Sequence, residues 1–162
     1  TSRLGHGKSE FGLDPEVIEI QEAGHVLDED GCSVSAVFTD HGGITTLCYG
    51  VEGEGRRVII SGDGLPQDGF TDFARDADLM VYECSGTAEF LARQPWGTWH
   101  ITPEALGDLA TDCGVRRLMI KHLVIEDITG DLMAVHDMGD RIRRHFEGEV
   151  MVGADGLAVD LG

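Results

Sequence analysis

Residues 57–64 read Arg-Val-Ile-Ile-Ser-Gly-Asp-Gly and place a short apolar strand directly before a sharp polar break. Compact apolar runs recur at 79–82 and 118–120, and each is followed closely by ionisable side chains. Uninterrupted apolar runs of this length are typical of strands that are covered on both faces. We therefore predict a sheet whose strands end in polar residues along one edge.

The sequence before this stretch has the pattern of antiparallel β-structure. Apolar and polar residues alternate over 32–39 and again over 46–51, and glycine-containing turns separate these runs from each other and from residues 57–60. A shorter strand is predicted at 17–20. Residues 1–15 are polar, lack a clear period and are interpreted as a loop or arm. The first third of the chain is therefore predicted to be mostly strands.

The sequence after this stretch alternates between helices and strands. A helix is predicted from the capping residue Thr102, followed by Pro103, to Gly114, a residue type that commonly ends helices. The other expected elements are a short helix around 70–75, a long helix over 132–146, and closing strands at 149–152 and 157–161. The whole pattern predicts one domain over residues 1–162, of the α/β (α+β) class, with a mixed sheet covered by helices on one face.

Composition argues against several classes of protein. The 162 residues are 41% hydrophobic and 26% charged, which is ordinary for globular proteins, and no apolar run approaches the ~18 residues of a membrane span. Residues 1–8 lack the apolar core of a signal peptide, so we expect a cytoplasmic protein with no membrane partner. The four cysteines form no CxxC pair, which argues against a zinc knuckle or a disulfide framework.

The charge balance limits the choice of partners. Thirty Asp and Glu residues oppose twelve Lys and Arg residues, and the formal net charge is −18. Most of such a surface repels a polyanion. Contact with a nucleic acid would therefore need a local basic patch, a bound metal ion or a further segment of protein.

Polar side chains stand at the predicted strand ends. His41, Asp63 and His122 each follow an apolar strand, Glu83 ends another, and His100 precedes the capped helix. Taken one at a time, such residues are more often satisfied polar groups, turn residues or helix entries than functional groups. As an ordered set at one edge they predict a metal site, because imidazole and carboxylate are ligands that suit zinc, manganese or iron.

The order of these motifs resembles that of a known enzyme family. The segments that carry the resemblance are Thr39-Asp40-His41, Val58-Ile59-Ile60-Ser61-Gly62-Asp63, Leu79-Met80-Val81-Tyr82-Glu83, His100-Ile101-Thr102-Pro103-Glu104-Ala105 and Leu118-Met119-Ile120-Lys121-His122-Leu123. From about Val17 to Leu161, the chain is similar to the C-terminal half of the metallo-β-lactamase-fold hydrolases. It is most similar to their phosphodiesterase branch, which includes ribonuclease Z and cyclic-nucleotide phosphodiesterases. The resemblance implies the C-terminal half of a four-layer αβ/βα sandwich.

The resemblance also implies a role for each of the five residues. His41 matches the histidine that binds the first metal ion, Asp63 the aspartate that bridges both ions, and His122 the histidine on the second ion. His100 with Glu83 resembles the pair in which the histidine contacts the phosphate or protonates the leaving oxygen. The implied cofactors are two divalent ions, zinc with manganese or iron as alternatives. The implied reaction is hydrolysis of a phosphodiester, in RNA 3′-processing or in a cyclic or small substrate, by a metal-activated hydroxide.

Part of the family's metal site is missing from this sequence. The main metal motif, His-x-His-x-Asp-His, is absent, since no two of the seven histidines are spaced by one residue. Three protein ligands cannot hold two zinc ions, each of which normally takes at least three. We therefore expect the chain to be inactive without an N-terminal half of the same fold as its partner. The family also suggests a homodimer.

Smaller departures favour a phosphodiester substrate smaller than a tRNA. Gly64 stands where a Thr commonly follows the bridging aspartate, and Cys84-Ser85 replaces the usual Ala-Thr after Glu83. Ile101 likewise replaces the usual Ser after the active-site histidine.

Two other functions remain open from the sequence. One is a different hydrolase of the same fold, such as a lactonase or thioesterase, against which the pair of His100 and Glu83 argues. The other is a non-catalytic half-fold binding module, which would have no need to keep His41, Asp63 and His122 together.

Overall fold

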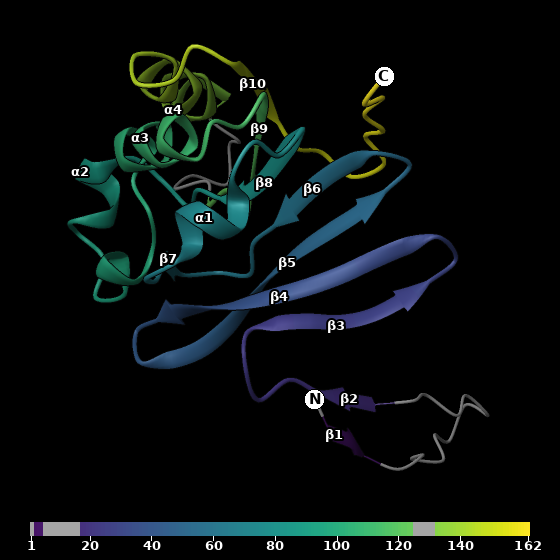
Figure 1. Cartoon of the computed structure of the whole chain (residues 1–162). Helices are drawn as coiled ribbons and strands as arrows, with labels where there is room; N and C mark the ends of the chain where they lie inside the picture. Colours follow the sequence, from purple (N-terminus) through teal and green to yellow (C-terminus); the bar gives the residue numbers. More distant parts are fainter. Residues whose placement is uncertain (1, 5–16, 125–131) are drawn as a thin grey trace.

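A computed structural model describes residues 2–4, 17–124 and 132–162 (Figure 1). The strands are β1 (Ser2–Leu4), β2 (Val17–Glu19), β3 (Gly24–Glu29), β4 (Cys32–His41), β5 (Ile44–Gly53), β6 (Arg56–Ile60), β7 (Leu65–Pro66), β8 (Leu79–Glu83), β9 (Arg117–Lys121) and β10 (Glu149–Val152). Eight of them form one mixed sheet in the order β10-β9-β8-β6-β5-β4-β3, with β7 paired to β4, while β1 and β2 form a separate ribbon.

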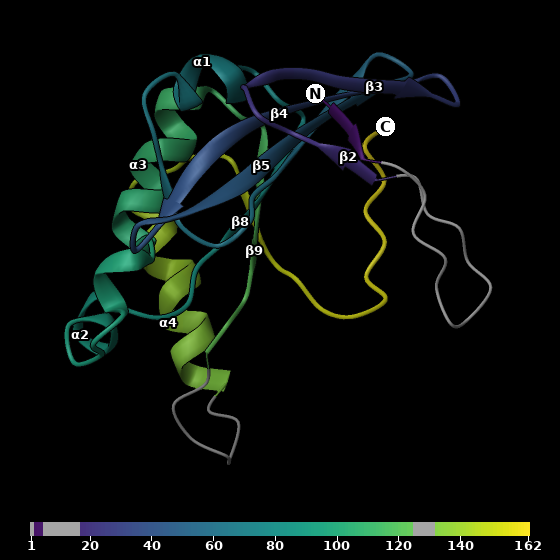
Figure 2. The ribbon, with the colours of Figure 1, turned by 90° about the horizontal axis from the view of Figure 1, so that it is seen from below.

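The helices lie on one face of this sheet (Figures 1 and 2). They are α1 (Phe70–Ala74), α2 (Ala88–Leu91), the 3-10 helix η1 (Gly97–Trp99), α3 (Pro103–Cys113) and α4 (Leu132–Arg143). None of these described helices is long and apolar enough to cross a membrane. The predicted class, a mixed sheet with helices on one face, is confirmed.

The sheet joins an antiparallel half to a parallel half. Strands β3 to β6 pair antiparallel, whereas β6, β8, β9 and β10 pair in parallel. Gly42 and Gly43 close the β4–β5 hairpin between the paired residues His41 and Ile44, with φ angles of 64° and 85°. A two-residue turn with positive φ at both positions suits glycine, which has no Cβ to clash. The turn therefore fixes His41 at the end of its strand.

The hydrophobic core lies between the sheet and the helices. Ile59, Met80 and Leu118, on three neighbouring strands, are fully buried in it. Leu106 of α3 and Ile142 of α4 belong to the same buried cluster. The core therefore fixes the helices against the parallel strands, whose carboxyl ends carry the predicted functional residues.

The opposite face of the sheet carries a second apolar row. Tyr49, Ile60, Val81, Met119 and Met151 are paired in succession across β5, β6, β8, β9 and β10. Because successive strand side chains point to opposite faces, these residues point away from the helices. Ile60 is 40% exposed, and no helix of the described chain covers this face (Figure 2). We call these five residues the outer apolar row.

The structure departs from the sequence-based expectations at both ends of the chain. Residues 157–161, predicted as a closing strand, form no strand. Arg117 donates to the backbone carbonyls of Asp160 and Leu161 instead, so a guanidinium satisfies groups that a strand partner would have satisfied. Strand β1 lies within the segment 1–15 that was expected to be a loop or arm, and residues 5–15 of it are outside the described range. The assignment of residues 1–162 to one domain stays a prediction.

Candidate metal and phosphodiester site

The strand ends bring the predicted residues to one edge of the sheet. His41 is the last residue of β4, Glu83 is the last residue of β8, and His122 directly follows β9. Asp63 lies in the loop between β6 and β7, and His100 follows η1. Carboxyl ends of neighbouring parallel strands meet at one edge, so the sheet topology itself gathers these side chains.

Two glycines let the Asp63 loop press against the neighbouring strands. A Cβ atom at Gly62 would lie 2.7 Å from the Leu47 carbonyl oxygen, and one at Gly64 would lie 2.6 Å from that of Asp40. Gly64 also has a φ of 125°, which side-chain-bearing residues rarely adopt. The departure from the family's Thr at position 64 therefore has a local steric reason.

Donors surround the carboxylate of Glu83, which is fully buried. Its Oε1 accepts from the backbone N–H groups of Gly64 and Ile101, at 3.4 and 3.3 Å, and lies 3.1 Å from Nδ1 of His100. Its Oε2 accepts from the hydroxyl of Ser85 at 3.1 Å. The carboxylate is thus fixed in orientation, and it holds the His100 ring in turn.

The hydroxyl of Ser85 sets the tautomers of two histidines. Ser85 donates its one hydroxyl proton to Oε2 of Glu83. Its oxygen then accepts from Nδ1 of His100 at 3.0 Å and from Nδ1 of His122 at 2.9 Å. Both rings therefore carry a proton on Nδ1, which leaves the Nε2 atoms for other partners.

His122 and Asp63 form the most direct contact between predicted metal ligands. Nε2 of His122 lies 3.4 Å from Oδ2 of Asp63, and both side chains are partly exposed. His122 has a φ of 55°, a left-handed conformation that costs a non-glycine residue roughly 1–2 kcal/mol. Strained backbone of this kind is concentrated at functional sites. Lys121 Nζ lies 3.9 Å from the other oxygen of Asp63.

The His122–Asp63 pair has the geometry of two ligands of one cation. A neutral imidazole protonated on Nδ1 offers a lone pair on Nε2, and a carboxylate oxygen is also an acceptor, so the two attract only through a cation or a shared proton. Two ligand atoms bound 2.0–2.1 Å from a tetrahedral zinc ion lie roughly 3.3–3.4 Å apart. The observed separation of 3.4 Å fits a divalent ion between the two atoms, and it also fits an ion pair with a protonated imidazole.

His41 adds an unsatisfied nitrogen to the same edge. Its ring packs edge-on against that of His100, with 4.8 Å between centroids. Its Nδ1 is buried and has no hydrogen-bond partner among the described residues. A buried nitrogen without a partner costs about 1–3 kcal/mol, and coordination of a metal ion would remove that cost.

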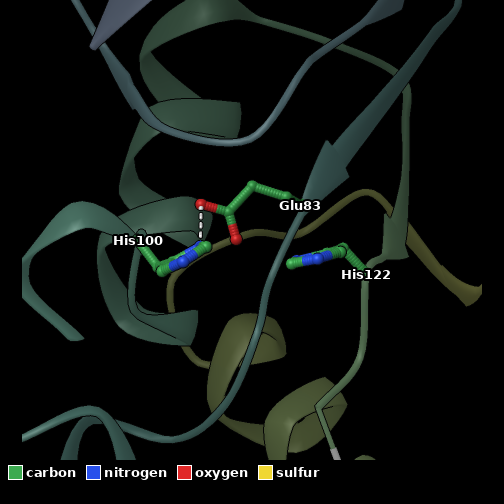
Figure 3. A group of neighbouring side chains, drawn as sticks. All are labelled: Glu83, His100 and His122. Carbon is green, nitrogen blue, oxygen red and sulfur yellow. Dashed lines mark ion pairs between the residues drawn. The ribbon is translucent and has the colours of Figure 1, made fainter. Parts of the chain in front are cut away.

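A second grouping of metal-binding atoms overlaps the predicted one. Glu83, His100 and His122 each offer an atom, and these atoms lie within 4.8 Å of one another (Figure 3). The oxygens of Glu83 and Nδ1 of His100 already have the hydrogen-bond partners described above. We therefore interpret Glu83 and His100 as a hydrogen-bonded pair, with Ser85 between that pair and His122. The ligand set of His41, Asp63 and His122 stays a prediction.

Ser85 and Lys121 lie in this site but were not predicted from the sequence to belong to it. Ser85 stands two residues after Glu83, and in an extended segment this spacing places both side chains on the same face. The sequence could therefore have indicated that Ser85 lies beside Glu83. Cys84, between them, is fully buried, and this burial raises the pKa of its thiol. A thiolate nucleophile at Cys84 is therefore disfavoured.

A surface hollow of about 360 Å³ opens beside the site. Lys121, His122 and Leu123 line one side of it, and residues 153–155 line the other. The loop after β10 therefore contributes to the surroundings of His122.

Comparison with known proteins places this arrangement in a fold class. No family model matches the chain. The metallo-β-lactamase-fold protein YhfI from Bacillus subtilis superposes with a TM-score of 0.67 and 21% identity, over 81% of this chain and 50% of that one. The short form of human tRNase Z gives a TM-score of 0.64 and 21% identity, over 87% of this chain and 48% of that one. The chain therefore has the metallo-β-lactamase fold, over about half the length of these structures.

The sequence comparison is more specific than the structural one. Ribonuclease Z of Myxococcus xanthus is 33% identical over 107 residues, which cover 66% of this chain and 33% of that protein. The chain thus spans about a third of the length of this curated relative. In sequence it is ribonuclease Z-like, as the motif order predicted. The expectation of a phosphodiester substrate smaller than a tRNA stays a prediction.

Proposed function

We propose that this chain provides part of the active site of a metal-dependent phosphodiesterase that acts on RNA. The observation that carries the proposal is the 3.4 Å approach of the acceptor atoms of Asp63 and His122. The buried, unpaired Nδ1 of His41 supports it, and so does similarity to proteins named ribonuclease Z.

His41, Asp63 and His122 would hold two divalent ions, zinc in the first instance, together with ligands from another segment. Such ions supply a hydroxide at neutral pH and neutralise charge on the phosphate. They would also place positive charge in a protein whose net charge is −18, which otherwise repels RNA. Lys121, beside Asp63, adds a cation at the same position.

His100 would deliver a proton to the leaving oxygen of the phosphodiester. Its Nδ1 is held by Glu83 and Ser85, so Nε2 is the atom that can face the substrate. The Glu83 carboxylate stabilises the imidazolium form from which that proton is transferred. Because His100 is 7% exposed and packed against His41 and His122, its ring has little freedom to turn away.

The remaining metal ligands would come from a second segment of the same fold that carries His-x-His-x-Asp-His. Two features support this part of the proposal: the motif is absent from the sequence, and the outer apolar row faces away from the helices. A row of apolar side chains on a sheet face that no described helix covers is typical of a face that packs against another layer.

The test supplies that second segment, fused or co-expressed, and measures hydrolysis of bis-p-nitrophenyl phosphate and of a precursor RNA. The completed protein should hydrolyse both substrates. His100→Ala should lower kcat about 100-fold or more and leave the metal content unchanged, because His100 acts in proton transfer. The matched control, His136→Ala on the exposed side of α4, should retain full activity.

Equal loss of metal and activity in His100→Ala would overturn the role given to His100. A completed protein that binds metal and hydrolyses a lactone or thioester, but no phosphodiester, would instead support the other hydrolase function.

A further inference from the structure

An exposed tryptophan stands at the rim of this site. Trp99 ends η1, and 37% of its surface is exposed. Its ring lies edge-on to that of His41, with 5.6 Å between centroids. His41 in turn contacts His100, so the rings form a continuous series from Trp99 to the centre of the site.

The turn at Gly42 supports the Trp99 indole. A Cβ atom at Gly42 would lie 2.4 Å from Cδ2 and from Cε2, the atoms shared by the two rings of the indole. These atoms are at the centre of the ring system, so the glycine backbone lies against one face of it. Residues with a side chain cannot occupy this position without displacing the indole. The indole is therefore held in place while part of it stays open to solvent.

The chain's second tryptophan has a different environment. Trp96 is half-buried, and its ring packs against Phe90 and against His100. Trp96 is therefore a packing residue that supports the ring of His100. No comparable packing partner on the open side of Trp99 is present among the described residues.

We propose that Trp99 is a stacking platform for a nucleobase of the substrate, next to the phosphodiester held at the site. This inference rests on the proposed function and specifies its substrate as one that carries a base. Stacking is sequence-tolerant, because every base has a π-face. It needs no positive charge, so it provides affinity for RNA on a surface whose net charge is −18.

The experiment uses the 162-residue chain and an uncharged probe, adenosine, with ribose as the control that lacks the base. Because the chain has two tryptophans, the indole N–H resonances can be assigned by comparison with Trp96→Phe. Adenosine should shift the Trp99 indole resonance upfield in a saturable way, and ribose should not. Trp99→Leu should weaken adenosine binding about tenfold, and Trp99→Phe, which keeps an aromatic face, should weaken it less.

Three results would each overturn the inference: an unmoved Trp99 resonance, an equal response to ribose, or adenosine binding that Trp99→Leu leaves unchanged. Circular dichroism of both variants distinguishes loss of stacking from loss of fold, and Trp99→Phe decides the question if Trp99→Leu does not fold. Adenosine contains no phosphodiester, so this outcome is independent of whether the completed protein is a phosphodiesterase.

Discussion

Ser85 shows how one uncharged side chain can organise several charged ones. Its hydroxyl contacts Glu83, His100 and His122, and its single proton decides which nitrogen of each ring is left free. On the proposed function, the free Nε2 of His122 is a metal ligand. Ser85 is then a positioning residue, and its contribution appears in metal affinity as well as in rate.

Ser85→Ala is expected to weaken zinc binding by the completed protein about 10- to 100-fold, because His122 loses the partner that fixes its tautomer. Competition with a chromophoric chelator measures this affinity directly. Ser85→Thr keeps the hydroxyl and should restore most of it. Unchanged zinc affinity in Ser85→Ala would mean that the hydroxyl does not orient His122.

The five candidate residues could be predicted from the sequence because each stands at a strand end that an apolar run makes visible. The contacts between them could not be predicted, since they depend on side chains from separate strands meeting in three dimensions. Gly64 is an example. In the sequence it is a departure from a family pattern, and the structure explains it by a carbonyl oxygen 2.6 Å from where its Cβ would be.

At the scale of elements, Asp78 joins the starts of two parallel strands at the edge opposite the site. It precedes β8 and accepts from the backbone N–H of Arg57 in β6 at 2.9 Å. That hydrogen bond, together with ion pairs to Arg56 and Arg116, lowers the pKa of Asp78. The carboxylate therefore stabilises the fold above its ordinary pKa, and this contribution is lost as the pH falls through the lowered value.

Asp78→Asn should lower the free energy of unfolding by roughly 1 kcal/mol at neutral pH, since a charged hydrogen bond becomes a neutral one. The difference between variant and wild type should shrink as the pH falls below 3.8, the ordinary pKa at which the unfolded wild-type carboxyl takes up a proton, and it should vanish once the pH has fallen through the lowered pKa of the folded state. Urea unfolding followed by circular dichroism at several pH values checks this. A difference that stays constant down to pH 2 would contradict the assigned role.

Helices and strands that are marked by capping residues or apolar patterns in their own sequence could be predicted. Those whose structure depends on residues far away in the sequence could not. Helix α3 begins and ends where Thr102 and Gly114 indicate: the Thr102 hydroxyl accepts from Ala105 N, and Gly114 is left-handed with a φ of 67°. Strand β3 lies at the sheet edge and is mostly exposed, so it lacks a clear apolar alternation. The segment 157–161 is mostly apolar, but it pairs with no strand, and the Arg117 guanidinium donates to the carbonyls of Asp160 and Leu161 instead.

For the whole molecule, the decisive feature is a sheet with one face covered by helices and one apolar row facing away from them. Burial of an exposed isoleucine is worth about 1.5–3 kcal/mol, so such a row favours association with another layer. The uninterrupted apolar runs of β6, β8 and β9 make this face visible in the sequence, because such runs are typical of strands covered on both faces.

The chain alone is expected to bind a hydrophobic dye and to self-associate through the outer apolar row. Ile60→Glu should reduce both effects without lowering the helix content, because Ile60 is 40% exposed at the centre of that face. Ile44→Glu is the matched control: Ile44 is 62% exposed but lies at the tip of a hairpin, outside the row. Equal effects of the two substitutions on dye fluorescence and sedimentation would argue against a specific docking face.

The central claim is that side chains at one edge of this sheet hold metal ions jointly with a second segment of the same fold. Zinc content per chain, measured by mass spectrometry after dialysis, tests it most directly. The completed protein should retain about two ions and the chain alone fewer than one, because three protein ligands are too few for two ions. Two tightly held ions in the chain alone, or none in the completed protein, would contradict the claim.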